Sequence, residues 1–431
     1  MKQLNSLLFA LVAIIFASCE SGVIEKITYK INEPIFMTKE TFRASVKVNT
    51  KAEEIVTLGK ICFYEGYLYI SEPQKGIHII DNRNPSSPQN IGFIELLGNA
   101  DLAIRDNLLY ADSFVDLVWF DVTNPAVPVL KDRLNDIFPT ALPVTINEYG
   151  YDYTQTFEQK DKGIVVGWKV VERTEDLKDH RGSWWGWNGG GMYMEDGMVS
   201  MNQTTTGSGS SNGINGSMSR FALYDNKLYV VLNNYMSIFD LSGTQPKKAG
   251  ESLYIGGNVE TIFSYEDNLF MGTPTGMLIY SVKNPYIPEY QSSIWHIFGC
   301  DPVVVANDLA YVTVHSGNNC GQNVNELFIV DVADVKTPKK LVSFAMTNPK
   351  GLGIDSNKLF LCDDGLKIFQ ITSSPTSLND NLIKHIKGME GFDLIPFNNT
   401  LMMIATDGLY QYDYSDTSNI RLLSKLSFAK K

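Results

Sequence analysis

The sequence is short of charged residues in general and of basic residues in particular, and these shortages exclude classes of protein. Only 19% of the 431 residues are charged, and 36 basic side chains face 48 acidic ones, giving a net charge of −12. Nucleic-acid binding needs a surplus of Lys and Arg against the phosphates, so we expect no nucleic-acid partner. The 44% hydrophobic content in turn excludes a wholly disordered chain.

Motifs of common metal and cofactor chemistry are also missing. The chain has five His, with no HxH or HExxH pattern and no calcium loop of the EF-hand type. It has no Walker loop and no GxGxxG turn after a strand. We therefore expect no metal site and no cofactor.

A hydrophobic run long enough to span a membrane is absent after the first twenty residues. The chain instead starts with Lys2, an apolar run over residues 7–16 and a small-residue exit, as a secretory signal does. The exit, Phe16-Ala17-Ser18-Cys19, resembles the lipobox of bacterial lipoproteins. That resemblance implies cleavage after residue 18 and lipid attachment to Cys19. The alternative is an ordinary signal peptide followed by an incidental cysteine.

A unit of about 41 residues recurs along the rest of the chain. Each copy has an apolar strand, a turn such as Asp106-Asn107, a second strand containing Leu-Tyr or Leu-Phe, and a third strand ending in an aspartate. Aromatic residues of the second strand recur at this spacing, at Tyr69 and Tyr110 and again at Tyr229, Phe270 and Tyr311. Short strands in repeats of 40–45 residues are typical of propeller blades. We predict an all-β propeller of four-stranded blades over 52–431, most simply with seven blades.

The third strands carry a resemblance to a known family. Residues 77–81, 117–122 and 328–332 are similar to the motif of the LVIVD-repeat family. The resemblance implies a β-propeller at the bacterial cell surface or in the periplasm, and it brings no catalytic residue. A turn explains the repeated aspartates: an aspartate after the third strand, followed within a few residues by Asn-Pro as in 81–85 and 121–125, can accept bonds from turn amides. We predict this structural role for the aspartates that follow the third strands: Asp81, Asp121, Asp240, Asp331 and Asp413.

One interval breaks the repeat. Tyr110 and Tyr229 are 119 residues apart, so an insertion lies at about 137–219. Within it, residues 163–171 predict a strand, and 137–175 would add an eighth blade if they formed a diverged unit; six blades are the other alternative. The rest is polar and rich in Gly, and it holds Trp184, Trp185 and Trp187. These tryptophans either contact a ligand such as carbohydrate or pack onto the propeller.

Cysteines and histidines give the remaining candidate residues. Cys62 and Cys362 lie in apolar strands and are assigned to the core. Cys300 and Cys320 lie in loops that emerge on one face of a blade, and an oxidising compartment would allow a disulfide between them. His296 and His315 are candidate ligand contacts on that face. Acidic loops at Asp112, Asp116, Asp363, Asp364 and Asp407 are expected beside them.

These features predict a signal peptide at 1–18, a lipidated tether with an N-terminal strand at 19–51, and the propeller from 52. We expect a protein of the bacterial cell envelope, held to the outer membrane or cell surface only by its lipid. Its loops would recognise a carbohydrate or an envelope protein without catalysis. The alternatives are an enzyme acting on polysaccharide at the propeller mouth and a structural subunit of an outer-membrane assembly.

Overall fold

The repeats fold into antiparallel sheets whose strands follow one another in chain order. The computed structural model describes residues 26–57, 59–176, 212–295, 302–315 and 324–429. The chain divides into two compact units. The larger contains residues 35–144, 160–167 and the described residues from 212 onward; the smaller contains 26–34, 145–159 and 168–176.

The larger unit contains seven blades, named A to G here in chain order. Blade A contains β3 (Ile61–Tyr64), β4 (Tyr67–Glu72), β5 (Gly76–Asp81) and β6 (Gln89–Glu95). Blade B contains β7 (Leu102–Arg105), β8 (Leu108–Ser113), β9 (Asp116–Asp121) and β10 (Val129–Leu134). Blade C contains β13 (Phe221–Tyr224), β14 (Lys227–Leu232), β15 (Tyr235–Asp240), β16 (Lys247–Lys248) and β17 (Leu253–Tyr254). Two short strands extend blade A, β2 (Lys47–Asn49) outside β6 and β12 (Ile214–Asn215) inside β3.

The remaining four blades each have four strands in one meander. Blade D contains β18 (Thr261–Tyr265), β19 (Asn268–Thr273), β20 (Gly276–Ser281) and β21 (Glu289–Trp295), and blade E contains β22 (Val303–Ala306), β23 (Leu309–Val314), β24 (Glu326–Asp331) and β25 (Lys339–Ala345). Blade F contains β26 (Leu352–Asp355), β27 (Lys358–Cys362), β28 (Leu366–Gln370) and β29 (Leu382–Ile386), and blade G contains β30 (Gly391–Phe397), β31 (Thr400–Ala405), β32 (Gly408–Asp413) and β33 (Arg421–Ser427). A 3-10 helix at Pro375–Asn381 precedes β29.

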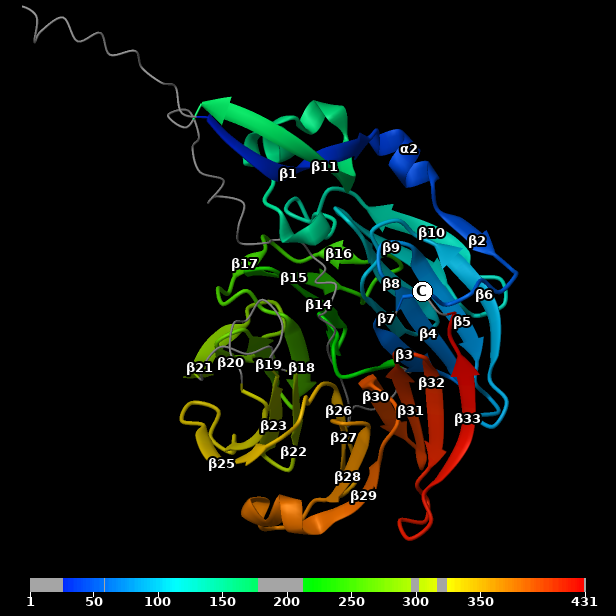
Figure 1. Cartoon of the computed structure of the whole chain (residues 1–431), viewed down its shortest axis with the longest axis vertical. Coiled ribbons are helices and arrows are strands. Elements are labelled where there is room, and N and C mark those ends of the chain that lie inside the picture. The colour runs from blue at the N-terminus through cyan, green and yellow to red at the C-terminus, as the bar shows by residue number, and fades with distance from the viewer. Residues whose placement is uncertain (1–25, 58, 177–211, 296–301, 316–323, 430–431) are drawn as a thin grey trace, which may run out of the picture. The chain divides into compact units, whose positions relative to one another are not determined.

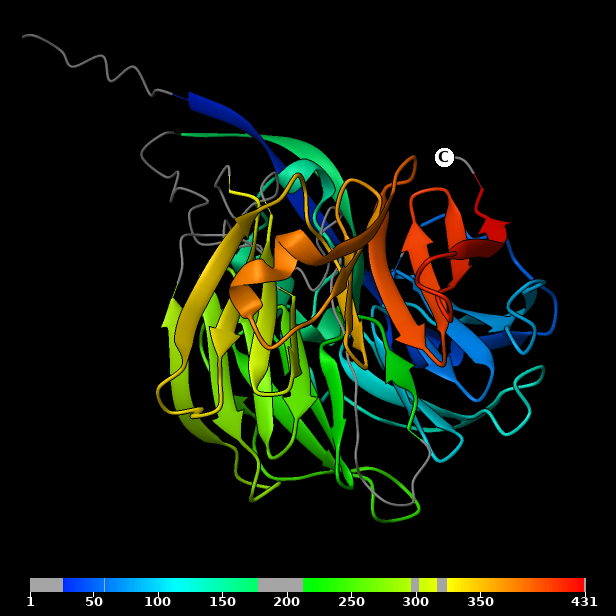
Figure 2. The same ribbon diagram turned by 90° about the horizontal axis from the view of Figure 1, so that it is seen from below.

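The blades close into a ring through their first strands. Each first strand contacts the next along the chain, and β30 of blade G contacts β3 of blade A. The red and blue ends of the colour scale therefore meet in Figures 1 and 2. Because β7 contacts β13 directly, the insertion adds no blade between B and C. The seven-blade prediction is confirmed, and residues 137–175 do not form an eighth.

Local sequence explains both the strands and their turns. The repeated aromatics Tyr69, Tyr229 and Tyr311 are fully buried between sheets. The hairpins between first and second strands place Asp106-Asn107 and Asn398-Asn399 at positive φ. Two-residue hairpin turns of type I′ require that conformation, which Asn, Asp and Gly adopt most readily. We call the end of the ring with these hairpins the lower face, and the opposite end the upper face.

The rest of the described chain lies before blade A and between blades B and C. It contains β1 (Lys26–Met37), α2 (Lys39–Ala44), β11 (Ile164–Asp176), which includes most of the predicted strand, and short helical turns at Ile146–Glu148, Thr154–Glu158 and Lys160–Lys162. β1 pairs with β11 in a two-stranded sheet. In the smaller unit the rings of Tyr151 and Trp168 stack 5.2 Å apart. No helix in the described ranges is long and apolar enough to cross a membrane.

Candidate functional site

The centre of the ring is filled by residues 212–220, which we call the plug. β12 pairs antiparallel with β3, with Ile214 opposite Phe63. On the other side, the Gly213 amide donates to the Ile104 carbonyl of β7 at 2.6 Å. The plug therefore adds an extended segment between the first strands of blades A and B.

The upper half of the plug reaches the far side of the ring. The Ser217 amide donates to Asp393 Oδ1 in blade G at 2.6 Å, and Ser217 Oγ accepts from the Leu352 amide in blade F at 2.7 Å. The Ser219 carbonyl accepts from the Ile262 amide in blade D at 3.0 Å. Contacts with blades on opposite sides place the plug on the axis, where its residues 214–219 are buried.

Charged residues surround the plug where the first strands begin. Lys60, Asp101 and Glu260 immediately precede the first strands of blades A, B and D. Arg220, the last residue of the plug, precedes that of blade C, so the sign of the charge alternates over these four blades. Asp101 accepts from the Ser219 hydroxyl at 3.0 Å and from the Arg220 amide at 2.5 Å. Lys60 Nζ donates to the Met218 carbonyl. Lys60 and Asp101 thus hold the plug by its polar groups.

Burial dominates the electrostatics of this cluster. Burial lowers the pKa of Lys60 to about 8, against the attraction of Asp101. It raises the pKa of Asp393 to about 7, against the hydrogen bonds from Ser217 and Leu394 and the charge of Lys60. Burial also raises the pKa of Asp101, and it raises that of Asp112 to about 6. The pKa values of Asp393 and Asp112 thus lie close to neutral pH.

The acidic loops predicted for one face do lie at the same end of their blades, and they make internal contacts. Asp112 Oδ1 accepts from the amides of Ala100 and Asp101 at 2.7 and 2.9 Å. Asp363 accepts from the Thr347 and Asn348 amides. Asp364 pairs with Lys387, directly after β29, and Asp407 pairs with Lys425 of β33.

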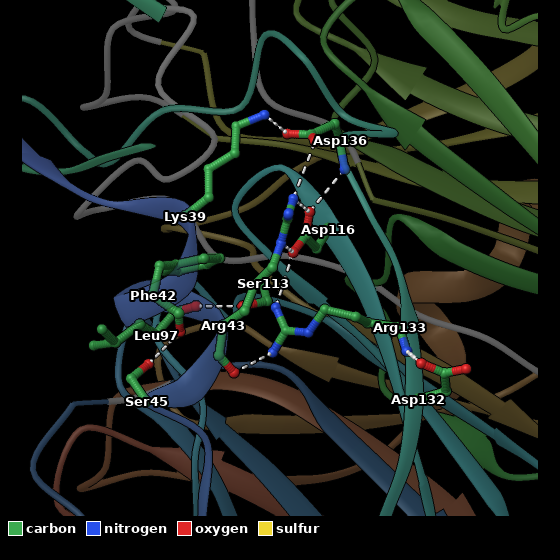
Figure 3. A network of polar contacts seen from close by, with 10 residues as sticks. All are labelled: Lys39, Phe42, Arg43, Ser45, Leu97, Ser113, Asp116, Asp132, Arg133 and Asp136. Atoms are coloured by element: carbon green, nitrogen blue, oxygen red, sulfur yellow. Dashed lines mark hydrogen bonds and ion pairs between the residues drawn. The ribbon is translucent and has the colours of Figure 1, made fainter. Parts of the chain in front are cut away.

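Asp116 anchors the N-terminal helix to blade B (Figure 3). Its carboxylate is fully buried and accepts two bonds from Arg43 of α2, at 2.9 and 3.1 Å, and one from Arg133 at 2.8 Å. Phe42 of α2 is buried 6.0 Å from Phe114, measured between ring centroids. Asp116 therefore holds α2 against blade B on the upper face.

Large exposed aromatic residues gather on blades C and D. Trp295 is 71% exposed and Tyr254 is 65% exposed, and they hold equivalent places, opposite the first residue of the third strand of their blades. Tyr235 packs edge-on against Tyr254 at 5.4 Å. The outer strands that carry these residues lie on one side of the ring in Figure 1. Exposed aromatic surface of this kind is typical of binding sites.

Several predicted residues lie outside the described residues. These are Cys19, the three tryptophans Trp184, Trp185 and Trp187, His296, and both cysteines of the predicted disulfide, Cys300 and Cys320. His315 is described and is buried at the upper end of blade E, directly after β23. Cys62 and Cys362 are buried free thiols, as expected for core positions.

The plug was missed in the sequence. Its residues belong to the polar, Gly- and Ser-rich stretch assigned to the insertion, and small residues of this kind normally indicate a surface loop. One feature of the sequence could have indicated the plug: residues 212–220 lie immediately before the first strand of blade C.

Comparison with known proteins supports the repeat assignment. The model of the LVIVD repeat matches residues 59–94 and 98–136, which are blades A and B. The chain carries LVIVD repeats. The third strands of the two matched LVIVD repeats are β5 and β9, both buried. No curated protein matches the chain significantly.

Solved propeller structures are similar at low identity. The designed protein Ika8 is 9% identical with a TM-score of 0.47, over 88% of this chain and 92% of that one. Hsv2 from Kluyveromyces lactis is 12% identical with a TM-score of 0.46, over 87% and 99%. BamB from Moraxella catarrhalis is 8% identical with a TM-score of 0.45, over 90% and 99%.

Proposed function

We propose that this protein is an exported, lipid-anchored propeller that recognises a partner at the cell envelope without catalysis. The observation that carries the proposal is the filled centre of the ring. An enzyme site at a propeller mouth needs convergent acid, base or nucleophilic groups open to substrate. Here the plug occupies the axis, and the upper-face carboxylates Asp112, Asp116 and Asp363 are bonded within the protein.

The aromatic residues of blades C and D supply the recognition surface of this proposal. Trp295 and Tyr254 expose large apolar faces with polar edges, as the anchors of protein interfaces do. Their positions on adjacent blades of a rigid ring would fix their spacing for a protein partner.

Alanine substitution of both anchors tests this surface. Purified wild type and the variant Tyr254→Ala/Trp295→Ala would be crosslinked in native envelope extracts, and the captured proteins compared by mass spectrometry. Leu422→Ala is the matched control, because Leu422 is an exposed apolar residue on the outer strand of blade G. We expect a partner captured by wild type and control and lost from the double variant. A partner captured equally by all three would overturn the assignment of the surface.

A glycan array with the same three proteins distinguishes carbohydrate from protein recognition. Glycan binding that is kept by wild type and control and lost from the double variant would mean that this surface recognises a glycan and not a protein. Release of reducing sugar from envelope polysaccharide by wild type would contradict the non-catalytic proposal.

Export and anchoring are tested separately. We expect the mature N-terminal peptide to begin at Cys19 with the mass of an attached lipid, and we expect Cys19→Ala to leave the membrane fraction. An unmodified Cys19 in the mature protein would leave recognition possible but remove the anchor.

A further inference from the structure

The plug is an additional element of the fold, because a short loop could connect blades B and C without it. Blades A and B are joined on the upper face by the short connection 96–101 between β6 and β7. Blade B also ends on the upper face, where the Phe138 amide donates to the Val115 carbonyl in the turn between β8 and β9. The chain could begin blade C from there with a similar loop.

The plug instead begins at the opposite, lower face of the ring. Asn212 forms a bridge with Arg105, next to the hairpin turn of blade B on the lower face. From Asn212 the plug runs up the axis to Arg220, whose amide reaches Asp101 on the upper face. Nine residues are thus threaded through the ring before blade C starts.

The plug is bound as a peptide ligand is bound. It adds a strand to the free edge of β3, and main-chain bonds of this kind give affinity for an extended peptide. Two side chains of the plug then select the sequence: Asn215 Nδ2 donates to the Leu102 carbonyl at 3.0 Å, and Ser217 Oγ accepts from the Leu352 amide. Asp393 adds a further main-chain bond by accepting from the Ser217 amide.

Two glycines make the fit selective. A Cβ on Gly216 would lie 2.2 Å from Asp393 Oδ2 and 2.7 Å from an Ile61 side-chain carbon. A Cβ on Gly213 would lie 2.7 Å from the Cys62 sulfur. Neither glycine has a positive φ, so space and not backbone conformation requires the absence of a side chain.

We propose that the central channel is a binding site for an extended peptide of the pattern Gly-Ile-Asn-Gly-Ser, and that residues 212–220 occupy it as a built-in ligand. The site is independent of the aromatic surface of blades C and D. Displacing the plug would open the channel along β3 and uncover the Cys62 thiol, which Gly213 covers.

Cys62 provides the test, with Cys362 as an internal control. Both thiols are buried; Cys62 lies against Gly213 of the plug, whereas Cys362 packs against Gly391 of blade G. The full-length protein would be alkylated with N-ethylmaleimide, and the label on each cysteine followed by peptide mass spectrometry. Gly216→Val introduces the excluded side chain; Gly243→Ala is the control, since its Cβ meets only one backbone oxygen at 3.6 Å.

We expect Gly216→Val to label Cys62 roughly tenfold faster or more, because several buried hydrogen bonds of the plug are lost, with Cys362 unchanged. A synthetic peptide of residues 212–220 should restore the protection of Cys62, and the same peptide with Val in place of Gly216 should not. Protection that stays complete in the variant, or that the peptide fails to restore, would overturn the proposal without affecting recognition by blades C and D.

If Gly216→Val labels both cysteines, the ring itself has unfolded. Ser217→Ala then replaces it, because this change removes the acceptor for the Leu352 amide without adding bulk. The same two outcomes, selective labelling of Cys62 and rescue by the peptide, decide for or against the channel site.

Discussion

Aspartates lie in two environments in this propeller. Where the pKa of an aspartate is shifted from its ordinary value, the two environments shift it in opposite directions. At the outer rim, the carboxylates at the ends of third strands accept bonds from the amide two residues later: Asp81 from Arg83, Asp121 from Thr123, Asp240 from Ser242, Asp331 from Ala333 and Asp413 from Ser415. Hydrogen bonds from Ser415 and Arg421 lower the pKa of Asp413 to about 2. Around the plug, burial raises the pKa of Asp393 and Asp112.

The difference shows what each set does. Rim carboxylates remain partly in water and are stabilised as anions by turn amides, so they fix local turns. Channel carboxylates are removed from water by the closed ring, and their hydrogen bonds compensate for only part of the desolvation. Asp393 ties blade G to the plug, and Asp112 ties blade B to the connection between blades A and B. Each therefore affects more of the structure than a turn carboxylate does.

The largest effect is expected from Asp393→Ala. The change leaves the buried amides of Ser217 and Leu394 without their acceptor, and each unsatisfied buried donor costs about 1–3 kcal/mol. We expect the free energy of unfolding to fall by about 3 kcal/mol in urea denaturation. Asp393→Asn is the control, because its amide oxygen can still accept both bonds and should restore most of the loss. Equal losses in the two variants would mean that the bonds to the plug contribute little.

The pH dependence of stability tests the same comparison. A carboxyl whose pKa is higher in the folded protein than in the unfolded chain stabilises the fold at low pH, and that stabilisation is lost as pH rises through the folded pKa. For Asp112 and Asp393 this window lies between about pH 4 and 7. The lowered pKa of Lys60 acts in the opposite sense, but only above pH 8. The rim aspartates Asp81 and Asp121 have lowered pKa values and add stability above about pH 4 that is lost in acid.

We therefore expect the melting temperature to fall between pH 5 and pH 8, by an amount equivalent to about 1–3 kcal/mol. Asp393→Asn should flatten this slope, because the variant cannot ionise there. A wild-type melting temperature that rises steadily over this range would show that the channel acids are ionised in the folded protein.

Arg43→Ala tests a buried carboxylate of a third kind, one neutralised by two guanidinium groups. Asp116 would keep Arg133 but lose the two bonds from α2. Breaking one partner of a buried charge network is destabilising, and the remaining arginine limits the loss to about 2 kcal/mol. Protection of the α2 amides from hydrogen exchange should fall more than that of blade D. Equal loss in both regions would contradict a local anchoring role.

The aspartate turns of the rim could be predicted from the sequence, whereas the plug and its contacts in the channel could not, and the reason is physical. Asp121 and Asn124-Pro125 lie within five residues, so the turn they form is encoded locally and can be read without the fold. Asp393 and Ser217 are 176 residues apart and meet only after the ring has closed. Even the glycines of the plug, which suit a surface loop, owe their presence to side chains from blades A and G.

The smallest effect is expected from Asp121→Ala, the rim counterpart of Asp393→Ala. Its carboxylate accepts from the Thr123 amide at 3.0 Å and pairs with the exposed Lys131 at 3.5 Å. Water can replace both partners, so we expect the free energy of unfolding to change by only about 0.5 kcal/mol. Urea denaturation of this variant beside Asp393→Ala measures the contrast directly. A loss at Asp121 as large as that at Asp393 would mean that the rim turns, and not the bonds across the axis, hold the propeller together.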